Sequence, residues 1–366
     1  MKIVSIVWFK VLPAKFGGQK GTAVFNQYLA AHFELTCLCS EDNAILEPLN
    51  YKVRNELPSG KSQFLQSSCW KKITDVVKEE KADVILLEYP YHAIAAYRAK
   101  QTTGAKIILH QHNIEHLRFK QLGKWWWRLL KSYEAWACRK ADLILFKTEE
   151  DRNHAVENFG ITEDKCLIVP YGIEEPTPAQ EDIRTKHRIK EDEKLLLFAG
   201  TLDYEPNAEA VKNIYEKLVP QLEQLGTSYK VLICGRNKFP SFQYLKNYIH
   251  ANVVQAGEVE DIAPYFQSAD VFINPVLSGG GVQTKIIDAL AHNCNVVAFD
   301  RCLQGIDSSV AANKIASVAD GDWKSFAQSI QQMQQHKEPT PPGFFHKYSW
   351  RSIIANIAPK IRHLSE

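Results

Sequence analysis

Residues 271–291, VFINPVLSGGGVQTKIIDALA, set the type of fold. A short apolar run, typical of a strand buried on both faces, precedes three glycines and a stretch with helical periodicity. The glycines leave backbone amides free at the helix start, the end of a helix that favours negative charge. Lys285 lies in the first predicted turn, and Asp288 lies one turn further on the same face. This strand–turn–helix unit suits a lysine for a pyrophosphate and a carboxylate for ribose hydroxyls, although a simple surface ion pair would give the same pattern.

The same alternation of short apolar strands and amphipathic helices runs through the whole chain. Strands are expected at residues 3–8, 35–39, 84–88, 107–110, 143–146, 166–169, 194–199, 230–234, 253–256, 271–275, 295–299 and 315–318. Helices are expected at 21–32, 68–80, 93–102, 125–140, 149–159, 207–225, 240–249, 262–267, 285–292 and 322–335. This pattern predicts an α/β protein with doubly wound parallel sheets.

Two proline-rich breaks divide the pattern into domains. Residues 170–180, PYGIEEPTPAQ, interrupt it once, and residues 338–343, EPTPPG, interrupt it again before a last amphipathic stretch at 349–364. We therefore predict two Rossmann-like domains, 1–172 and 173–348, with the closing segment 349–366 packed back on the first. Ligands of such sheets bind beyond the carboxyl ends of the strands, so the two sheets should face each other across one cleft.

Composition narrows the class of protein. The chain has 366 residues, a formal net charge of +2 and a mean hydropathy of −0.27, which fits a globular protein and does not favour a nucleic-acid partner. Eight cysteines include no C-x-x-C pair, so we expect reduced thiols and no structural zinc. The apolar start, MKIVSIVWFK, is too short for a signal peptide or a membrane span. These features predict a cytoplasmic protein.

Two further turns carry candidate chemistry. In residues 16–22, FGGQKGT, Gly17, Gly18 and Gly21 allow close backbone approach and Lys20 adds a mobile charge, so an anion loop and a plain turn both remain open. The spacing is not the dinucleotide-binding G-x-G-x-x-G. Residues 110–116, HQHNIEH, follow a predicted strand with three histidines, which are costly to bury without purpose. A polar surface loop, a metal cluster and a sugar-binding or catalytic loop are the alternatives there.

Together these motifs resemble those of GT-B fold retaining glycosyltransferases of family 4, also called group 1, in particular the bacterial polysaccharide and lipopolysaccharide branch. The matching pieces follow the family's order over nearly the whole chain, at residues 17–21, 112–115, 133–134, 141–142, 169–173, 198–200, 206–207, 235–236, 257–259, 269–270, 279–291 and 348–350. The resemblance implies a nucleoside-diphosphate sugar as donor substrate, bound mainly by the second domain. It also implies an acceptor on the first domain, retained anomeric configuration, and neither a metal nor another cofactor.

Residue roles follow from the same resemblance. Asp288 would hold the donor ribose, and His112 would act in catalysis beside the donor sugar. Glu258 and Val259 would lie near the base. The other implied contacts are Gly17, Gly18, Lys20, Gly279, Gly280, Gly281 and Val282 for the donor, and Asn113 and Glu115 on the acceptor side.

Two positions depart from the family pattern. The first glutamate of the family's E-x7-E motif is replaced by Gly280, so a sugar-hydroxyl contact must come from backbone amides or from elsewhere. The usual arginine and lysine are also absent from residues 201–207, TLDYEPN. Charge on a leaving diphosphate still needs neutralising. We therefore take Lys285 and Arg236 as catalytic candidates, with Lys20 reaching from the first domain.

The segment 118–140 is basic and rich in tryptophan. It contains seven lysines and arginines, one acidic residue, Glu134, and the run Trp125, Trp126 and Trp127. Tryptophan beside basic residues suits the headgroup region of an anionic membrane. A helix that buries its tryptophans under a solvated basic face explains the pattern equally well. The membrane alternative predicts peripheral contact with the inner face of the plasma membrane, where a lipid-linked acceptor would be presented.

These observations predict a glycosyltransferase of the hexosyltransferase class that acts on a glycan or lipid-linked acceptor. One alternative is a GT-B nucleotide-sugar 2-epimerase, although the several acidic and basic catalytic residues it needs are not found. The other is a catalytically inactive nucleotide-binding homologue, which Gly280 motivates.

Overall fold

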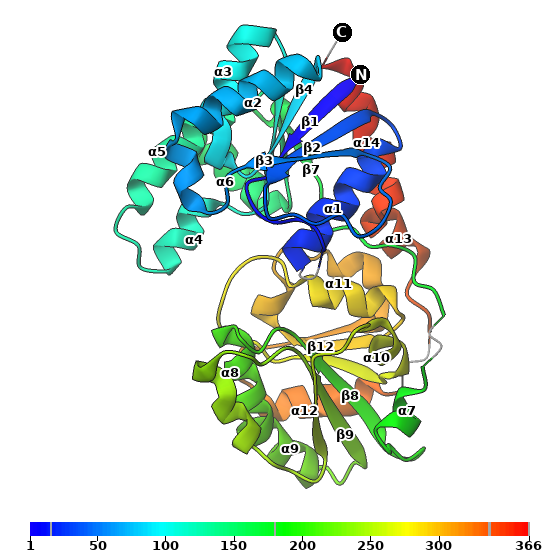
Figure 1. The fold of residues 1–366 in the computed structure, drawn as a ribbon. Helices are drawn as coiled ribbons and strands as arrows, with labels where there is room; N and C mark the ends of the chain where they lie inside the picture. Colours follow the sequence, from blue (N-terminus) through cyan, green and yellow to red (C-terminus); the bar gives the residue numbers. More distant parts are fainter. Residues whose placement is uncertain (15–16, 179–180, 336–337, 365–366) are drawn as a thin grey trace. The chain divides into compact units, whose positions relative to one another are not determined.

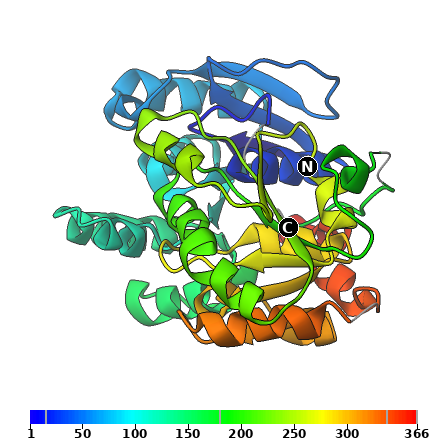
Figure 2. The same ribbon diagram turned by 90° about the horizontal axis from the view of Figure 1, so that it is seen from below.

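The computed structural model describes residues 1–14, 17–178, 181–335 and 338–364 and divides into two compact units. The first unit comprises Met1–Gly172 with Tyr348–Glu366, and the second comprises Ile173–Lys347. Each unit is a parallel sheet with helices packed on it (Figures 1 and 2).

The first unit contains a seven-stranded sheet in the order β3-β2-β1-β4-β5-β6-β7, parallel throughout. Its strands are β1 (Lys2–Ile6), β2 (Glu34–Ser40), β3 (Lys52–Leu57), β4 (Val84–Glu88), β5 (Lys106–Gln111), β6 (Leu143–Phe146) and β7 (Cys166–Ile168). Its helices are α1 (Gly17–Ala30), α2 (Ser67–Glu79), α3 (Ala93–Thr103), α4 (Glu115–Gln121), α5 (Trp127–Lys140), α6 (Glu149–Phe159) and α14 (Trp350–His363), with short 3₁₀ turns η1 (Lys61–Leu65), η2 (Pro90–His92) and η3 (Glu163–Lys165).

Apolar side chains cover both faces of this sheet. Helices α2, α3, α5 and α6 pack on one face, and α1 and α14 pack on the other. The closing helix α14 contributes Trp350, Ile353, Ile354, Ile357 and Ile361 to the core under α1, and thus belongs to the first unit (Figure 1).

The second unit contains a six-stranded parallel sheet in the order β10-β9-β8-β11-β12-β13. Its strands are β8 (Lys194–Ala199), β9 (Tyr229–Cys234), β10 (Val253–Gly257), β11 (Val271–Asn274), β12 (Asn295–Phe299) and β13 (Ile315–Val318). Its helices are α7 (Ile183–Lys186), α8 (Glu205–Asn213), α9 (Val219–Gln224), α10 (Ala263–Ser268), α11 (Thr284–Ala291), α12 (Trp323–Met333) and α13 (Pro342–Tyr348), with a π turn η4 (Ile214–Leu218) and 3₁₀ segments η5 (Pro240–Asn247), η6 (Asp300–Leu303) and η7 (Ser308–Lys314).

The predicted α/β architecture with two doubly wound parallel sheets is confirmed, although the structure differs from the local predictions at several elements. Strand β3 was missed because its sequence, KVRNEL, is charged; as an edge strand, its Arg54 reaches Glu56, Glu79 and Glu80 instead of a core. The helix expected at 240–249 is the 3₁₀ segment η5. Helix α4 begins inside the polar loop expected at 110–116. All eight cysteines are buried and have free thiols.

A close approach of backbone and ring joins α14 to the end of the first unit. A Cβ atom at Gly172 would lie 2.2 Å from Cδ2 of Trp350, and Trp350 itself is 2% exposed. Only a glycine leaves room for the indole at this point. The contact therefore holds the start of α14 against the segment after β7.

We predict that Gly172→Ala lowers the free energy of unfolding by about 1–3 kcal/mol, the usual cost of overpacking a core. Urea denaturation followed by tryptophan fluorescence measures this change. Gly343→Ala is the matched control, because nothing lies within 4 Å of a Cβ atom built there. Equal stability of the two variants would contradict the proposed role of this contact.

Candidate functional site

One buried carboxylate holds two histidines at the carboxyl end of the first sheet. Glu88 ends β4 and is 1% exposed, while His110 lies on the neighbouring β5 and His112 follows that strand. Glu88 accepts hydrogen bonds from His110 Nδ1 at 3.1 Å and from His112 Nε2 at 2.5 Å. Phe25 packs on the His110 ring and Tyr89 stacks on the His112 ring, with centroids 4.8 and 4.3 Å apart.

The charge state of this cluster follows from burial and pairing. Burial alone would raise the pKa of Glu88, but His110 and His112 hold it well below its usual value. Burial lowers the pKa of His110 to about 3 and also lowers the pKa of His112. At neutral pH one carboxylate therefore accepts N–H groups from two neutral imidazoles, which leaves Nδ1 of His112 as a hydrogen-bond acceptor.

The same three side chains could also bind a metal ion. One ligand atom each from Glu88, His110 and His112 lies within 4.8 Å of the other two. A carboxylate with two imidazoles suits a divalent transition metal such as Zn²⁺. The metal alternative considered for the histidine loop thus has a geometric basis, and metal independence stays a prediction.

Sequence reasoning did not single out Glu88. The available signal was a charged residue at the end of the apolar run VILLE, beside the polar end of the next strand. A carboxylate in that place is costly to bury unless partners hold its charge. The parallel register that pairs Glu88 with His110 supplies those partners.

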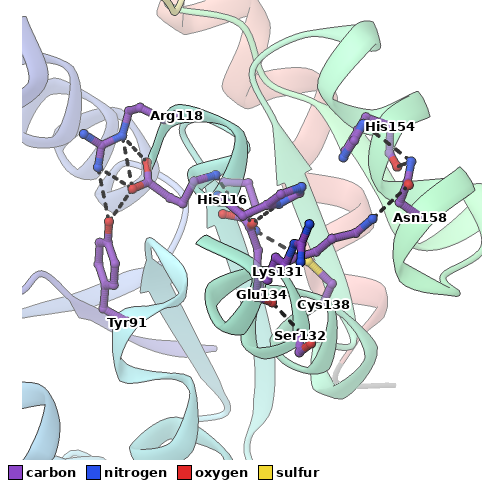
Figure 3. A network of polar contacts seen from close by, with 12 residues as sticks. Tyr91, His116, Arg118, Lys131, Ser132, Glu134, Cys138, His154 and Asn158 are labelled. Atoms are coloured by element: carbon purple, nitrogen blue, oxygen red, sulfur yellow. Dashed lines mark hydrogen bonds and ion pairs between the residues drawn. The ribbon is translucent and has the colours of Figure 1, made fainter. Parts of the chain in front are cut away.

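The predicted acceptor-side residue Glu115 begins α4 and is held in place by neighbours. Its carboxylate is fully buried and accepts hydrogen bonds from Arg118 and from the Tyr91 hydroxyl (Figure 3). Buried Glu134 on α5 accepts the backbone N–H groups of Glu115 and His116 at 2.8 and 3.1 Å, and also His116 Nδ1 at 2.8 Å. Glu134 therefore caps α4, since negative charge stabilises a helix start. The half-buried Asn113 lies between β5 and α4, and its acceptor role stays a prediction.

In the second unit, Lys285 approaches the end of β8. Its Nζ lies 3.2 Å from Oδ1 of Asn207 on α8 and 4.5 Å from the ring centroid of Phe198 on β8. Burial lowers the pKa of Lys285 to about 7. Among the described residues it has no carboxylate within ion-pair distance. Lys285 is thus a partly buried lysine with no compensating carboxylate among the described residues.

The glycine-rich turn, residues 279–281, lies against the start of α8, which Lys285 also contacts. Gly279 has a φ of 89°, and a Cβ atom there would lie 3.0 Å from Pro206 and 3.1 Å from the Tyr204 hydroxyl. Gly281 also has a positive φ, and all three glycines are exposed. Val282 and Asp288 are half-buried, with Asp288 one turn beyond Lys285 on α11.

Arg236, the second cation predicted for the donor site, lies in the segment after β9. Arg236 Nε donates to Asp203 at 2.8 Å, and Asp203 also accepts the backbone N–H groups of Lys238 and Phe239. Arg236 therefore has a buried carboxylate partner where Lys285 has none. Its role at a diphosphate stays a prediction.

A pocket of about 310 Å³ lies beside this segment, at the ends of β9 and β10. Glu258 lines it and pairs with Lys238, Oε2 to Nζ, at 2.6 Å. Gly235 also lines the pocket, and a Cβ atom there would lie 1.8 Å from the carbonyl oxygen of Gly200. Val259 follows Glu258 and is half-buried.

Helix α1 begins at Gly17, four residues before the start expected from the sequence. Lys20 is exposed, a Cβ atom at Gly18 would have nothing within 4 Å, and Gly21 lies against the Tyr171 ring. Phe16, the first residue of this predicted loop, lies outside the described residues. The donor contacts expected for Gly17, Gly18 and Lys20 stay predictions.

Family models match residues in both units of the chain. The family description "Glycosyltransferase Family 4" matches residues 17–175, and "Glycosyl transferases group 1" matches residues 193–336. A Klebsiella pneumoniae protein, "Uncharacterized 44.6 kDa protein in cps region", is 25% identical over 252 residues, which are 64% of this chain and 61% of that protein. The match thus spans less than two thirds of this relative.

Solved structures show the same fold. A sucrose-phosphate synthase from Thermosynechococcus elongatus superposes with a TM-score of 0.74 at 14% identity, covering 99% of this chain and 98% of that one. Anabaena HepE in complex with UDP superposes with a TM-score of 0.75 at 14% identity, covering 99% and 100%. HepE is also solved in complex with UDP-glucose.

No helix in the described part of the chain has the length and apolar character to cross a bilayer.

The two family matches fall one in each unit, and the solved structures cover both units together. The chain therefore belongs to the family 4, or group 1, glycosyltransferases, with the GT-B fold.

Proposed function

We propose that this glycosyltransferase moves a hexose from a nucleoside-diphosphate sugar to an acceptor hydroxyl, with retention of configuration and without a metal. The observation that carries the proposal is Lys285, a desolvated lysine that lies with the glycine-rich turn against the start of α8. Such a cation suits a ligand that brings its own negative charge. The HepE complexes with UDP and UDP-glucose support a uridine-diphosphate sugar as the first donor to test.

In the second unit, different segments bind different parts of the donor. The amides of Gly279, Gly280 and Gly281 face the phosphates and the sugar, and Asp288 takes the ribose hydroxyls. The pocket lined by Glu258 takes the base. Charge on the diphosphate grows as the glycosyl bond breaks, so Lys285 stabilises the transition state more than the bound donor.

The donor nucleotide is expected to stabilise the protein against heat. A ligand at 100 times its Kd adds about 2.7 kcal/mol to the free energy of unfolding. Thermal unfolding with UDP-, GDP- and ADP-sugars identifies the base of the donor. Turnover is then measured as release of nucleotide from the stabilising donor, with or without an acceptor. A protein that binds but releases none is the inactive homologue, and one that changes the sugar without releasing nucleotide is the 2-epimerase.

Binding of UDP at pH 8 should be accompanied by uptake of a proton. The pKa of Lys285 is about 7, so the amine is mostly neutral at pH 8, and a bound diphosphate favours the charged form. Affinity should accordingly rise as pH falls from 9 towards 7. Calorimetry in two buffers of different ionisation enthalpy measures the proton count. Lys285→Arg is the control, since arginine stays charged and should bind without uptake; unchanged uptake in it would contradict the assignment.

In the first unit, His112 offers a neutral hydrogen-bond acceptor for a sugar hydroxyl. Glu88 accepts its Nε2–H, which fixes the ring and directs Nδ1 away from that bond. A sugar hydroxyl can then donate to Nδ1. Glu88 acts through this ring and is a positioning residue.

We predict that His112→Ala lowers kcat by about 10²–10⁴-fold, the range for a well-placed polar catalytic group. Glu88→Gln should lower kcat less and leave the affinity for UDP unchanged. EDTA should leave the wild type active. Loss of activity in EDTA that Zn²⁺ or Mn²⁺ restores would instead assign Glu88, His110 and His112 to a metal ion.

The basic segment 118–140 supports an acceptor at a membrane surface. The structure separates its tryptophans: Trp126 packs on Phe119 and Trp127 lies under Lys120, whereas Trp125 is 82% exposed at the turn between α4 and α5. This turn projects from its unit in both ribbon views (Figures 1 and 2). We define the hairpin tip by its exposed side chains, which are Lys120, Leu122, Lys124, Trp125, Arg128 and Leu129.

The hairpin tip combines apolar side chains with positive charge. Glu115 and Glu134, the acidic residues of α4 and α5, are both buried in hydrogen bonds, so no carboxylate of these helices opposes the tip. Basic residues near an anionic membrane contribute about 1 kcal/mol each, and tryptophan favours the interface. We propose that the tip contacts an anionic bilayer.

Changing Lys120, Lys124 and Arg128 to Gln should weaken binding to vesicles of anionic phospholipid roughly a hundredfold, since three charges contribute about 3 kcal/mol. Leu122→Ser with Trp125→Ser should also weaken it. Sedimentation with anionic and neutral vesicles measures both. Leu65→Ser with Ile249→Ser is the matched control, because these side chains are 87% and 89% exposed elsewhere. Equal sedimentation of tip and control variants would refute the membrane contact.

A further inference from the structure

A surface pocket between α2 and α3 of the first unit has no role in the function proposed so far. Its volume is about 440 Å³, and the two helices that form it lie side by side (Figure 1). Pockets of a few hundred Å³ are the size that small ligands occupy. Its lining includes Trp70 and Lys71 of α2 and Tyr97, Arg98, Gln101 and Thr102 of α3.

The guanidinium group of Arg98 lies over an aromatic ring in this pocket. Its Cζ is 4.5 Å from the centroid of the Trp70 ring. Trp70 is itself held in place, because it packs against the core and donates its indole N–H to the carbonyl oxygen of Phe64 at 3.0 Å. A guanidinium held over a ring keeps its N–H groups available to a carboxylate, which can accept two of them. The Trp70 ring thus orients Arg98 for an anion.

The pocket carries positive charge that the described chain does not neutralise by ion pairs. Lys71 and Arg98 line it, and the Lys140 ammonium lies 5.0 Å from the centroid of the Tyr97 ring. In the part of the chain that the structure describes, these cations have no carboxylate at ion-pair distance. The sequence of α3, AIAAYRAKQTT, has no acidic residue, and Asp75, one turn after Lys71 on α2, does not line the pocket. The pocket therefore favours a ligand that brings its own negative charge.

The neutral groups of the pocket suit the ring and the hydroxyls of a sugar. Gln101 is exposed, and its amide makes no hydrogen bond within the described ranges, so it can both donate and accept. The Thr102 hydroxyl donates to the carbonyl oxygen of Arg98 at 2.8 Å and can still accept a hydrogen bond. Half-buried Trp70 and Tyr97 add apolar surface for C–H groups. Together with the oriented guanidinium, these groups match a sugar ring that bears a carboxylate.

The pocket is separate from the sites described above. Its α3 residues lie in the second half of that helix, which ends at Thr103, shortly before β5 begins at Lys106. This half therefore lies towards the amino ends of the strands, whereas His112 follows the carboxyl end of β5. Lys140 ends α5, roughly 20 Å along that helix from the hairpin tip at its start. A ligand of the pocket is thus neither the donor nor the membrane contact proposed for the tip.

We propose that the pocket between α2 and α3 binds an acidic sugar unit, such as a hexuronate, within a glycan chain. Arg98 and Lys71 bind the carboxylate, and Gln101 and Thr102 bind ring hydroxyls. The pocket gives the protein a contact with a glycan away from the turns where sugar transfer is proposed. Binding there does not depend on the proposed reaction, and it can be measured without a donor.

Direct binding of acidic oligosaccharides tests this site. Tetrasaccharides of galacturonate, glucuronate and mannuronate are titrated into the full chain by calorimetry, with the methyl ester of the same tetrasaccharide as the neutral match. At least one acidic tetrasaccharide should bind, and its methyl ester should bind about tenfold more weakly or not at all. Arg98→Gln and Lys71→Gln should each weaken binding about tenfold. Arg351→Gln is the matched control, because Arg351 is exposed on α14, which packs on the opposite face of the sheet.

The outcomes separate the sugar site from its alternatives. Equal binding of the acidic tetrasaccharides and their methyl esters, or no binding of either, would overturn the proposal. The same holds if Arg98→Gln and Lys71→Gln bind as tightly as Arg351→Gln. Sedimentation with anionic vesicles that Arg98→Gln and Lys71→Gln both abolish would assign the pocket to lipid headgroups instead. Unchanged thermal unfolding of the variants shows that a loss of binding is not a loss of fold.

Discussion

Burial of parallel strands on both faces is the constraint on which the rest of this structure depends. Strands such as β4 and β11 are buried along their whole length, and helices cover both faces of the first sheet. Polar side chains are costly in such layers, so they gather where the strands end and the chain turns. Both candidate clusters lie at such ends, Glu88 with His110 and His112 in one unit and Lys285 with the glycine-rich turn in the other.

The buried carboxylates of the two units each organise a loop. Glu88 holds two imidazoles, Glu134 caps α4, and Asp203 binds Arg236 together with two backbone amides. Each is paired, because an unpaired buried charge would cost several kcal/mol. Lys147 and Lys285 differ in that no carboxylate lies at ion-pair distance among the described residues.

Asp203 also explains one departure from the family pattern. Where the family has an arginine and a lysine, this chain has TLDYEPN, and its aspartate draws Arg236 into an ion pair. The sequence showed that the usual cations were missing and offered Lys285 and Arg236 in their place. The sequence could not show which of Lys285 and Arg236 is better suited to a diphosphate. That depends on which of them already pairs with a carboxylate in the folded chain.

The sequence by itself determined the class of fold and indicated the turns where candidate site residues lie. Strand and helix periods, glycine turns and two proline-rich breaks predicted doubly wound sheets, and ordered motifs indicated the glycosyltransferase family. The amphipathic closing helix was visible in the sequence, but its contact with Gly172 was not. Edge strand β3 escaped prediction because charged side chains, held by salt bridges, interrupt its apolar positions, although Val53 and Leu57 pack against the core.

Only the tertiary structure decided which groups share a site. Glu88 meets His112 because β4 and β5 pair in parallel register, and Lys147 joins them through the register of β5 with β6. These residues are 24 or more positions apart in the chain or lie on different strands, so no local pattern links them. Burial in the same packing also lowers the pKa of His110, His112 and Lys147, which the residue types alone do not indicate.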